Sequence, residues 1–179
     1  MRLNRMASQP KLRMVLIASG VAAALLSATA VAETLVETNR YGGTYIAYAQ
    51  VHRPDGTYRR MLTTLDILEA AASGAPLPNG THILMESYYA PGEIGTVFHK
   101  RKVDGKWQYG SFSGTGNIDL STEPRVSCLS CHAQVVKTDF TFTHQLMEHA
   151  LADGFSTVHC NRTGRTPCDA VTYRFGSGP

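Results

Sequence analysis

The sequence lacks the features of several common protein classes. No internal repeat and no low-complexity tract is present after residue 32, which argues against a solenoid or a long disordered segment. Basic clusters are missing as well. Four of the 17 lysine and arginine side chains fall in residues 1–32, so the remainder carries 13 against 14 acidic side chains, a net charge of about −1. We therefore expect no nucleic-acid partner.

The chain also lacks an apolar run of membrane-spanning length. Its main run, residues 14–28, is shorter than the roughly 20 residues that a transmembrane helix needs. Basic residues precede this run, and Ala30-Val31-Ala32 follows it with the small side chains that signal peptidase requires. Residues 1–32 are therefore predicted to be a cleavable signal peptide for export to the periplasm, with an uncleaved anchor as the alternative. Residues 33–179 suffice for one domain but not for two.

Cysteine is scarce, and only one pair is closely spaced: Cys128 and Cys131. A structural zinc site usually needs two such pairs, so zinc fits poorly. A thioredoxin-like redox pair is a second alternative, but that chemistry has no need of the histidine at position 132. The whole string, Cys128-Leu-Ser-Cys131-His132, matches the CxxCH attachment site of a c-type haem.

In such a site the thiols of Cys128 and Cys131 form thioethers with the two vinyl groups of the porphyrin. The imidazole of His132 then becomes the proximal ligand of the iron. The sequence therefore predicts one covalently attached haem c, carried by a mono-haem domain over residues 33–179. The same oxidising compartment allows Cys160 and Cys168 to close a short loop through a disulfide, the alternative being two free buried thiols.

The remaining sequence favours an α+β, β-dominated fold, with an antiparallel sheet and a few short helices. Two segments have helical character: Thr64 can cap residues 65–73, and Thr143 can cap residues 144–153. Stretches rich in β-branched and aromatic residues predict strands, and Asp104-Gly105 predicts a hairpin turn. The predicted strands cover residues 44–51, 58–62, 81–88, 95–102 and 107–112.

Two segments resemble the cytochrome P-460 family. After the CxxCH string, residues 137–143 (KTDFTFT) are similar to the Lys-x-Asp-x-x-Phe-Thr tail of that family. Upstream, residues 74–81 (GAPLPNGT) resemble its Gly-x-x-x-Pro-Asp-Gly-Thr segment, and Glu86 and Trp107 also stand where members carry them. The resemblance implies a β-rich, homodimeric periplasmic haem protein with an iron open to small gaseous ligands.

Met85 bears on which activity the resemblance implies. Family members that oxidise hydroxylamine carry, at the matching position, a lysine joined covalently to the porphyrin. A thioether cannot form that bond, so Met85 disfavours the enzyme and favours the relatives that bind NO or CO at an open distal face. A six-coordinate electron-transfer cytochrome is a further alternative. The chain is thus not assigned as an enzyme; as one, it would be a haem-dependent oxidoreductase acting on hydroxylamine or NO.

Several further residues are candidates for the site. Glu123, shortly before Cys128, is a candidate catalytic proton-handling group, because active relatives place an acid there. Met85 is expected at the haem edge, as a packing residue or as a sixth ligand. The alternative ligands are Met61, Met147, His52, His82, His99, His144, His149 and His159. Lys137 and Arg125 flank the haem segment and are candidates for pairing with the propionates.

Roles beside the proximal histidine and on the distal side of the haem are also assigned from position. Asp139 is expected to tie the loop after the haem site to backbone amides, or to accept the second proton of the proximal imidazole. Glu86 should point away from Met85 by strand alternation and is expected to be a solvated carboxylate. Four aromatic residues are candidates for an apolar distal cap: Tyr88, Tyr89, Phe98 and Phe112.

Overall fold

The computed structural model describes residues 34–174. The predicted signal peptide and its alternative, a membrane anchor, lie outside the described residues. Within the described part of the chain, no helix has the length and apolarity that a bilayer-spanning helix requires.

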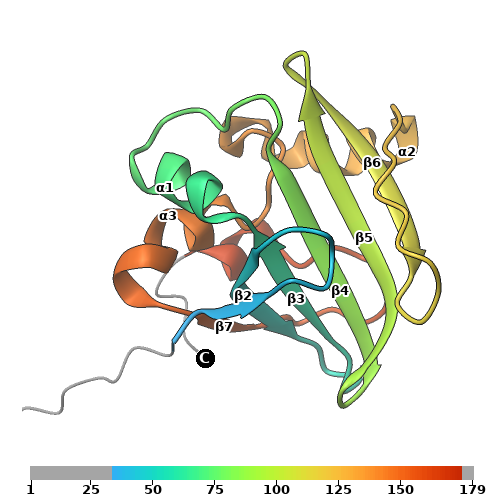
Figure 1. Ribbon diagram of the computed structural model, residues 1–179. Coiled ribbons are helices and arrows are strands. Elements are labelled where there is room, and N and C mark those ends of the chain that lie inside the picture. Colours follow the sequence, from blue (N-terminus) through green and yellow to red (C-terminus); the bar gives the residue numbers. More distant parts are fainter. Residues whose placement is uncertain (1–33, 175–179) are drawn as a thin grey trace, which may run out of the picture. The chain divides into compact units, whose positions relative to one another are not determined.

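The described residues form a seven-stranded sheet (Figure 1). Neighbours in the order β1-β2-β3-β4-β5-β6 pair antiparallel, and β7 pairs parallel with β2. This confirms the β-dominated α+β expectation, including all five predicted strands; β1 and β7 were not predicted. The strands are β1 Val36–Thr38, β2 Tyr45–His52, β3 Tyr58–Thr63, β4 His82–Ala90, β5 Glu93–Val103, β6 Lys106–Ser113 and β7 Ser156–His159.

Three α-helices and two 3₁₀ segments complete the fold of residues 34–174. The two predicted helices are present as α1 and α3, but neither predicted threonine hydroxyl caps its helix. That of Thr143 instead hydrogen-bonds the Tyr48 hydroxyl at 2.7 Å in the core, because this threonine is buried beside β2. The segments are α1 Leu65–Ala72, α2 Val126–His132, η1 Ala133–Thr138, α3 His144–Asp153 and η2 Ala170–Tyr173.

The hairpin between β5 and β6 has the conformation that its sequence predicts. Asp104 and Gly105 both have positive φ, at 48° and 74°, as the two central residues of a type I′ turn require. Aspartate and glycine are among the residues that adopt this conformation at least cost. The turn fixes the register of β5 and β6, and with it the face on which their side chains lie.

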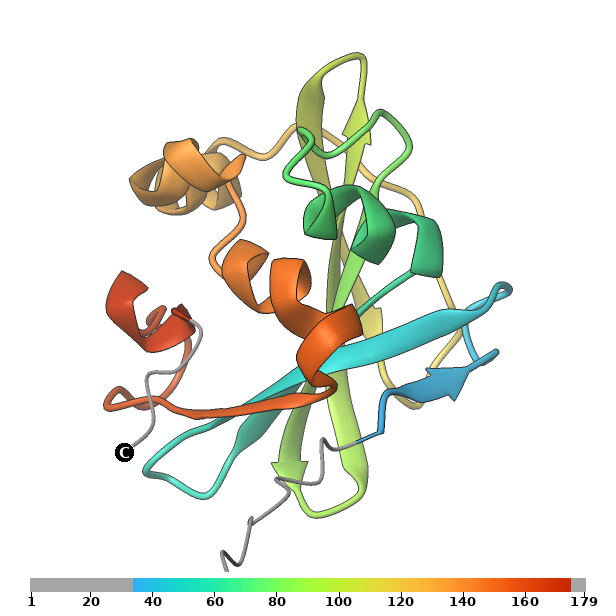
Figure 2. The same cartoon turned by 90° about the vertical axis from the view of Figure 1, so that its left-hand side faces the viewer.

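The sheet has two buried faces. Figure 2 shows α1, α2, α3 and η2 on one side of it, and strand alternation sends Met61, Met85 and Phe98 toward these helices, in register with one another. Alternate residues such as Leu62 and Leu84 form a separate apolar core on the opposite side. We call these the helix-covered face and the second face.

The second face is closed by the loop between β1 and β2. The guanidinium of Arg40 donates to the carbonyl of Gly114, just after β6, and the ring of Tyr41 contacts that of Phe112 with centroids 6.0 Å apart. The loop thus joins the two ends of the strand order and covers the apolar side chains between them.

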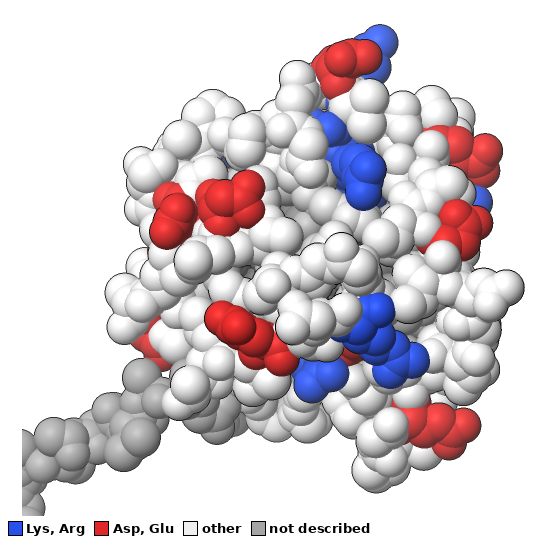
Figure 3. Space-filling view, viewed as in Figure 1, with Lys and Arg blue, Asp and Glu red and all other residues white. Residues whose placement is uncertain are grey.

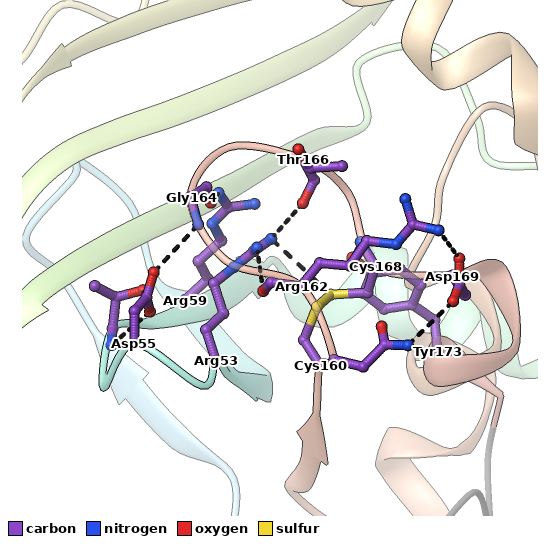
Figure 4. The surroundings of a disulfide bond; sticks show 12 residues. Arg53, Asp55, Arg59, Cys160, Arg162, Gly164, Thr166, Cys168, Asp169 and Tyr173 are labelled. Carbon is purple, nitrogen blue, oxygen red and sulfur yellow. Dashed lines mark hydrogen bonds and ion pairs between the residues drawn. A yellow bond between two sulfur atoms is a disulfide. The ribbon is translucent and has the colours of Figure 1, made fainter.

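The disulfide between Cys160 and Cys168 is present, as the sequence predicts, and closes a loop after β7 (Figure 4). Arg53, which is 5% exposed, fastens this loop to the β2–β3 hairpin. Its guanidinium donates to the backbone carbonyls of Arg162 at 2.9 Å and Thr166 at 3.0 Å. We call residues 160–168 the disulfide loop.

A second set of contacts joins the disulfide loop to the same hairpin. The Arg59 guanidinium donates to the carbonyl of Gly164 at 2.8 Å, and the Gly164 amide donates to the Asp55 carboxylate at 3.1 Å (Figure 4). The position of the loop is therefore fixed at both its centre and its ends, by backbone groups that do not depend on its side-chain identities.

Charged side chains of both signs form small, separate groups on the face shown in Figure 3, with uncharged surface between them. On this face the electrostatic field is therefore mixed rather than dominated by one sign.

Candidate cofactor site

A cavity of about 270 Å³ lies on the helix-covered face of the sheet. One wall is the sheet itself, through alternate residues of β2 to β6. The other wall combines α2, residues 141–143, the disulfide loop and η2. Most of its exposed lining is apolar; the members used below are Arg59, Met61, Ile83, Met85, Phe98, Lys100, Tyr109, Cys128, Cys131, His132, Phe142, Arg165 and Tyr173.

The three residues of the CxxCH string border this cavity together. Cys128 and Cys131 stand one helical turn apart on α2, so their side chains share one face of the helix. Both thiols are free and partly buried, and Cys128 packs against the apolar core of the helix-covered face. His132, the last residue of α2, lines the cavity beside them.

The ring of His132 has a defined tautomer and orientation. Its Nδ1 lies 2.7 Å from the carbonyl oxygen of Phe140, and because a carbonyl only accepts, Nδ1 must carry the proton. The rings of Tyr109 and Phe142 pack on either side, each with its centroid 5.4 Å from that of the imidazole. None of the described residues hydrogen-bonds to Nε2, which leaves its lone pair for a ligand in the cavity.

The electrostatic surroundings keep this imidazole neutral. Burial lowers the pKa of His132 to about 4, and the nearby Lys100 acts in the same direction, whereas the Phe140 carbonyl opposes both. A neutral ring is the form that coordinates a metal ion.

An unusual turn presents the Phe140 carbonyl to the histidine. Asp139 and Phe140 both have left-handed backbone conformations, with φ of 51° and 55°, which non-glycine residues seldom adopt in succession. The Asp139 carboxylate accepts from the Lys102 ammonium at 2.7 Å and from the Trp107 indole at 3.2 Å. These two side chains of β5 and β6 hold the turn in place.

Asp139 has neither of the two roles in the form expected for it. It does tie down the segment after the CxxCH string, but through the side chains of Lys102 and Trp107 rather than through backbone amides. It does not accept the second proton of the imidazole, because the backbone carbonyl of Phe140 does so.

The residues around the cavity fit a covalently bound haem. Two free thiols and a neutral imidazole with an unused nitrogen converge on an apolar space, and the cations Arg59 and Arg165 lie at its border, where they can pair with propionates. Among the described residues, no three His, Cys, Asp or Glu side chains are grouped to hold a bare metal ion. A haem iron needs no such group, because the porphyrin supplies four of its ligands.

The sheet wall brings two of the three candidate methionine ligands to the cavity. Met61 and Met85 are register partners on β3 and β4 and both line it. Met147 is fully buried in the core on α3. Of the histidines proposed as alternative ligands, His99 borders the cavity, but its ring hydrogen-bonds His82 and packs near Phe112 on the second face.

One of the four aromatic candidates for a distal cap lies at the cavity. Phe98 is on β5, in register with Met85. Tyr88 and Phe112 belong to the core of the second face, and the ring of Tyr89 is 57% exposed. The expectation of an aromatic cap is therefore wrong for these three. Strand alternation turns Tyr88 and Phe112 to the second face, and Tyr89 lies at the surface.

The charged candidates lie away from the cavity lining. The Glu123 side chain is 67% exposed and pairs with Arg125 at 3.0 Å, while its backbone bridges to Tyr109. Lys137 is exposed on η1 and borders a different, polar depression beside α3. The cations that do border the cavity are Arg59, Lys100 and Arg165.

Glu86 corrects a further expectation. It points away from Met85, as strand alternation predicts, but it is 1% exposed rather than solvated. Its carboxylate accepts from the Tyr41 hydroxyl at 2.5 Å, the Tyr88 hydroxyl at 2.8 Å and the Arg60 guanidinium at 2.8 Å. The second face thus contains a buried carboxylate that three neighbouring side chains hydrogen-bond.

Strand alternation could have identified two of the residues that sequence reasoning missed. Arg59 stands two positions before Met61, and Lys100 two positions after Phe98, so each shares a face with a residue already singled out. Arg165 and Tyr173 carry no such signal, because they reach the cavity only through the disulfide loop and η2.

Comparison with known proteins yields no family assignment: no protein-family model matches the sequence, and no curated protein matches it. The resemblance to the cytochrome P-460 family stays a prediction from the motifs.

Proposed function

We propose that this chain is a mono-haem c-type cytochrome that binds NO or a similarly small nitrogen-oxide ligand. In this proposal, Cys128 and Cys131 hold the haem through thioethers, and His132 is the proximal ligand. The observation that carries it is the convergence of these three residues on one apolar cavity, with the Nε2 nitrogen of the imidazole left without a hydrogen-bond partner.

The surrounding residues have separable roles in this proposal. The Phe140 carbonyl and the flanking rings of Tyr109 and Phe142 orient the imidazole. Arg59 and Arg165 at the cavity border are suited to hold the propionates. When bound, the haem would supply an iron that can bind a diatomic molecule.

The character of the sheet wall supports a neutral ligand. Ile83, Met85 and Phe98 line part of it with groups that donate no hydrogen bond, whereas Arg59, Lys100 and Tyr109 are donors elsewhere on the same wall. The apolar part gives little advantage to O₂, which gains from a hydrogen-bond donor, and this favours NO or CO. The family resemblance also leads us to expect a homodimer, which light scattering tests. The predicted signal peptide leads us to expect a periplasmic location, which cell fractionation tests.

A six-coordinate electron carrier is the second candidate, because the thioethers of Met61 and Met85 both reach the cavity lining. Either sulfur bound to iron would leave no open position. Hydroxylamine oxidation has no comparable support, since Met85 stands where the family's crosslinking lysine would be.

The first experiment tests attachment. The full chain should be expressed in a host that matures c-type cytochromes, and its intact mass should exceed that of the processed polypeptide by one haem. Replacing either Cys128 or Cys131 with serine should reduce covalent attachment, and replacing both should abolish it. An unmodified mass for the wild-type chain would overturn the proposal.

The second experiment tests coordination on the same holoprotein. A ferrous high-spin spectrum that shifts with CO or NO supports the ligand-binding function. A low-spin spectrum that CO leaves unchanged supports the electron carrier, and Met61→Leu and Met85→Leu then identify the ligand. His132→Ala should change the spectrum, whereas the matched exposed-strand variant His159→Ala should not.

A further inference from the structure

Lys100 occupies an unusual position for a lysine. It is 6% exposed, on the cavity side of β5. Its Nζ donates to the Phe140 carbonyl and to the Thr141 hydroxyl, both at 2.7 Å, and lies 3.8 Å from the centroid of the Trp107 ring. Burying a lysine is costly, and these three contacts offset that cost.

One of these partners is shared with the proposed iron ligand. The Phe140 carbonyl oxygen accepts from Lys100 Nζ at 2.7 Å and from His132 Nδ1 at 2.7 Å. A carbonyl has two lone pairs, so both bonds form, but each donor reduces the electron density available to the other. Both the ammonium and the neutral amine can donate, so the contact does not depend on the protonation state of the lysine.

We propose that Lys100 is a positioning residue that, through the shared Phe140 carbonyl, limits how strongly His132 donates electrons to the haem iron. This inference rests on the proposed function, because it presupposes that His132 is the proximal ligand.

The direction of the effect follows from the hydrogen-bond chain. A carbonyl that accepts strongly from Nδ1–H makes the imidazole more like an imidazolate, which is a better donor to iron and favours the ferric state. Lys100 weakens that acceptor, so it favours the ferrous state. A positive charge on the lysine would act in the same direction, since the ferric haem carries one more positive charge than the ferrous haem.

Lys102 provides a matched comparison within the same strand. It lies two residues further along β5 and also holds the turn, by donating to Asp139 at 2.7 Å and to the Leu77 carbonyl at 2.8 Å. It makes no contact with the Phe140 carbonyl among the described hydrogen bonds. A purely structural role for Lys100 would therefore be reproduced by removing Lys102.

The test compares Lys100→Met with Lys102→Met in the full-length holoprotein. Lys100→Met should raise the ferric-to-ferrous ratio at a fixed applied potential by about tenfold, taken from the lower end of the changes in metal affinity or activity that follow when a partner of a metal-ligating histidine is altered. It should also move the iron–histidine stretching vibration of the ferrous form to higher frequency. Lys102→Met should lower the unfolding midpoint while leaving the ratio within about twofold of wild type.

Two results would overturn the inference. One is an unchanged ratio and vibration in Lys100→Met; the other is an equal change in both variants, which would mean that each acts only by holding the turn. If Lys100→Met does not fold, Lys100→Gln and Lys102→Gln replace the pair. The shorter amide of Lys100→Gln should give a shift of the same sign, about threefold, and no shift there also overturns the inference.

Failure of this inference is distinguishable from failure of the proposed function. A chain that carries no covalent haem, or whose spectrum does not change in His132→Ala, defeats the proposed function itself. A haem-bearing chain with His132 as ligand, but with a redox ratio indifferent to Lys100, defeats only the role of the lysine.

Discussion

The two faces of the sheet differ in how their buried polar groups are hydrogen-bonded. On the second face, the Glu86 carboxylate is bonded to Arg60, Tyr41 and Tyr88, and a chain of hydrogen bonds runs from the Tyr45 hydroxyl to His82 and on to His99. These groups partner one another, except for the Nε2 nitrogen of His99, which has no hydrogen-bond partner among the described residues. The space around them is filled by apolar side chains.

On the helix-covered face the hydrogen bonds converge instead on one carbonyl. Lys100 and His132 both donate to Phe140, and Lys102 with Trp107 fixes the preceding Asp139. The outcome is one ring nitrogen directed at a cavity. The comparison teaches that burial of charge alone does not mark a site. What distinguishes the site is a hydrogen-bond network that orients one imidazole beside two free thiols at an apolar cavity.

The largest expected loss of stability comes from a substitution on the second face. Glu86→Ala leaves the Arg60 guanidinium and two tyrosine hydroxyls without their shared acceptor, so the free energy of unfolding should fall by about 3–5 kcal/mol. Urea denaturation measures it. The exposed residue at the start of β5, changed as Glu93→Ala, is the control and should cost little. A loss of less than 1 kcal/mol in Glu86→Ala, on the order of a surface pair, would show that the network contributes little.

A second prediction concerns the disulfide loop, which forms part of the cavity wall. Changing both Cys160 and Cys168 to serine opens the disulfide loop, and chain entropy predicts a loss of about 2–3 kcal/mol in unfolding free energy. Because the loop carries Arg165, dissociation of CO from the ferrous holoprotein should also change, whereas in Glu86→Ala it should not. Identical CO kinetics in the serine double variant and wild type would argue against the loop as a wall of the site.

A third prediction concerns the left-handed turn. Asp139→Ala removes the acceptor of Lys102 and Trp107 and places a residue with little tolerance for positive φ at 51°. The expected loss is about 2 kcal/mol. Asp104→Ala is the matched control, since Asp104 has a similar φ of 48° in an exposed hairpin. Its loss should be about half as large; equal losses would mean that only backbone strain matters.

The smallest effect is a pH dependence assigned to the second face. Burial, with Arg101 and His99 contributing, lowers the pKa of His82 to about 3. Below pH 6.5 the unfolded chain therefore binds a proton at this position that the folded chain does not. Stability should fall with pH, by about 1 kcal/mol over the first unit below 6.5, continuing toward pH 3.

The variant His82→Gln isolates this contribution. Its unfolding midpoint in urea, measured at pH 7.5 and 5.5, should change less with pH than that of wild type. Parallel pH profiles would contradict the assignment to His82 and would leave the other buried histidines as the source.

Five of the seven strands of the described residues, the two longer helices and the disulfide could be predicted from the sequence, because each depends on local signals. Asp104-Gly105 specifies its turn by backbone preference, and the two remaining cysteines pair in the structure, as an oxidising compartment allows. Helix α2 escaped prediction, since none of its residues is buried and its sequence has no apolar periodicity to detect.

The site itself was only partly predictable. The CxxCH string identified Cys128, Cys131 and His132 by spacing alone. The role of the Phe140 carbonyl was not predictable, because a backbone group leaves no trace in side-chain patterns and its position depends on two left-handed residues. The burial of Glu86 depends on Arg60, a partner from a neighbouring strand, so a rule based on residue type misjudged it.

The parallel pairing of β7 with β2 bears on the order in which the molecule assembles. Ser156 lies opposite Ala49, so this contact joins distant parts of the chain, and such contacts form slowly. The hairpins β4–β5 and β5–β6 close between near neighbours. We therefore expect the CxxCH segment to remain accessible to an attachment enzyme until the C-terminal stretch docks. Pulsed hydrogen exchange during refolding should show β7 amides protected later than those of β5; simultaneous protection would contradict this order.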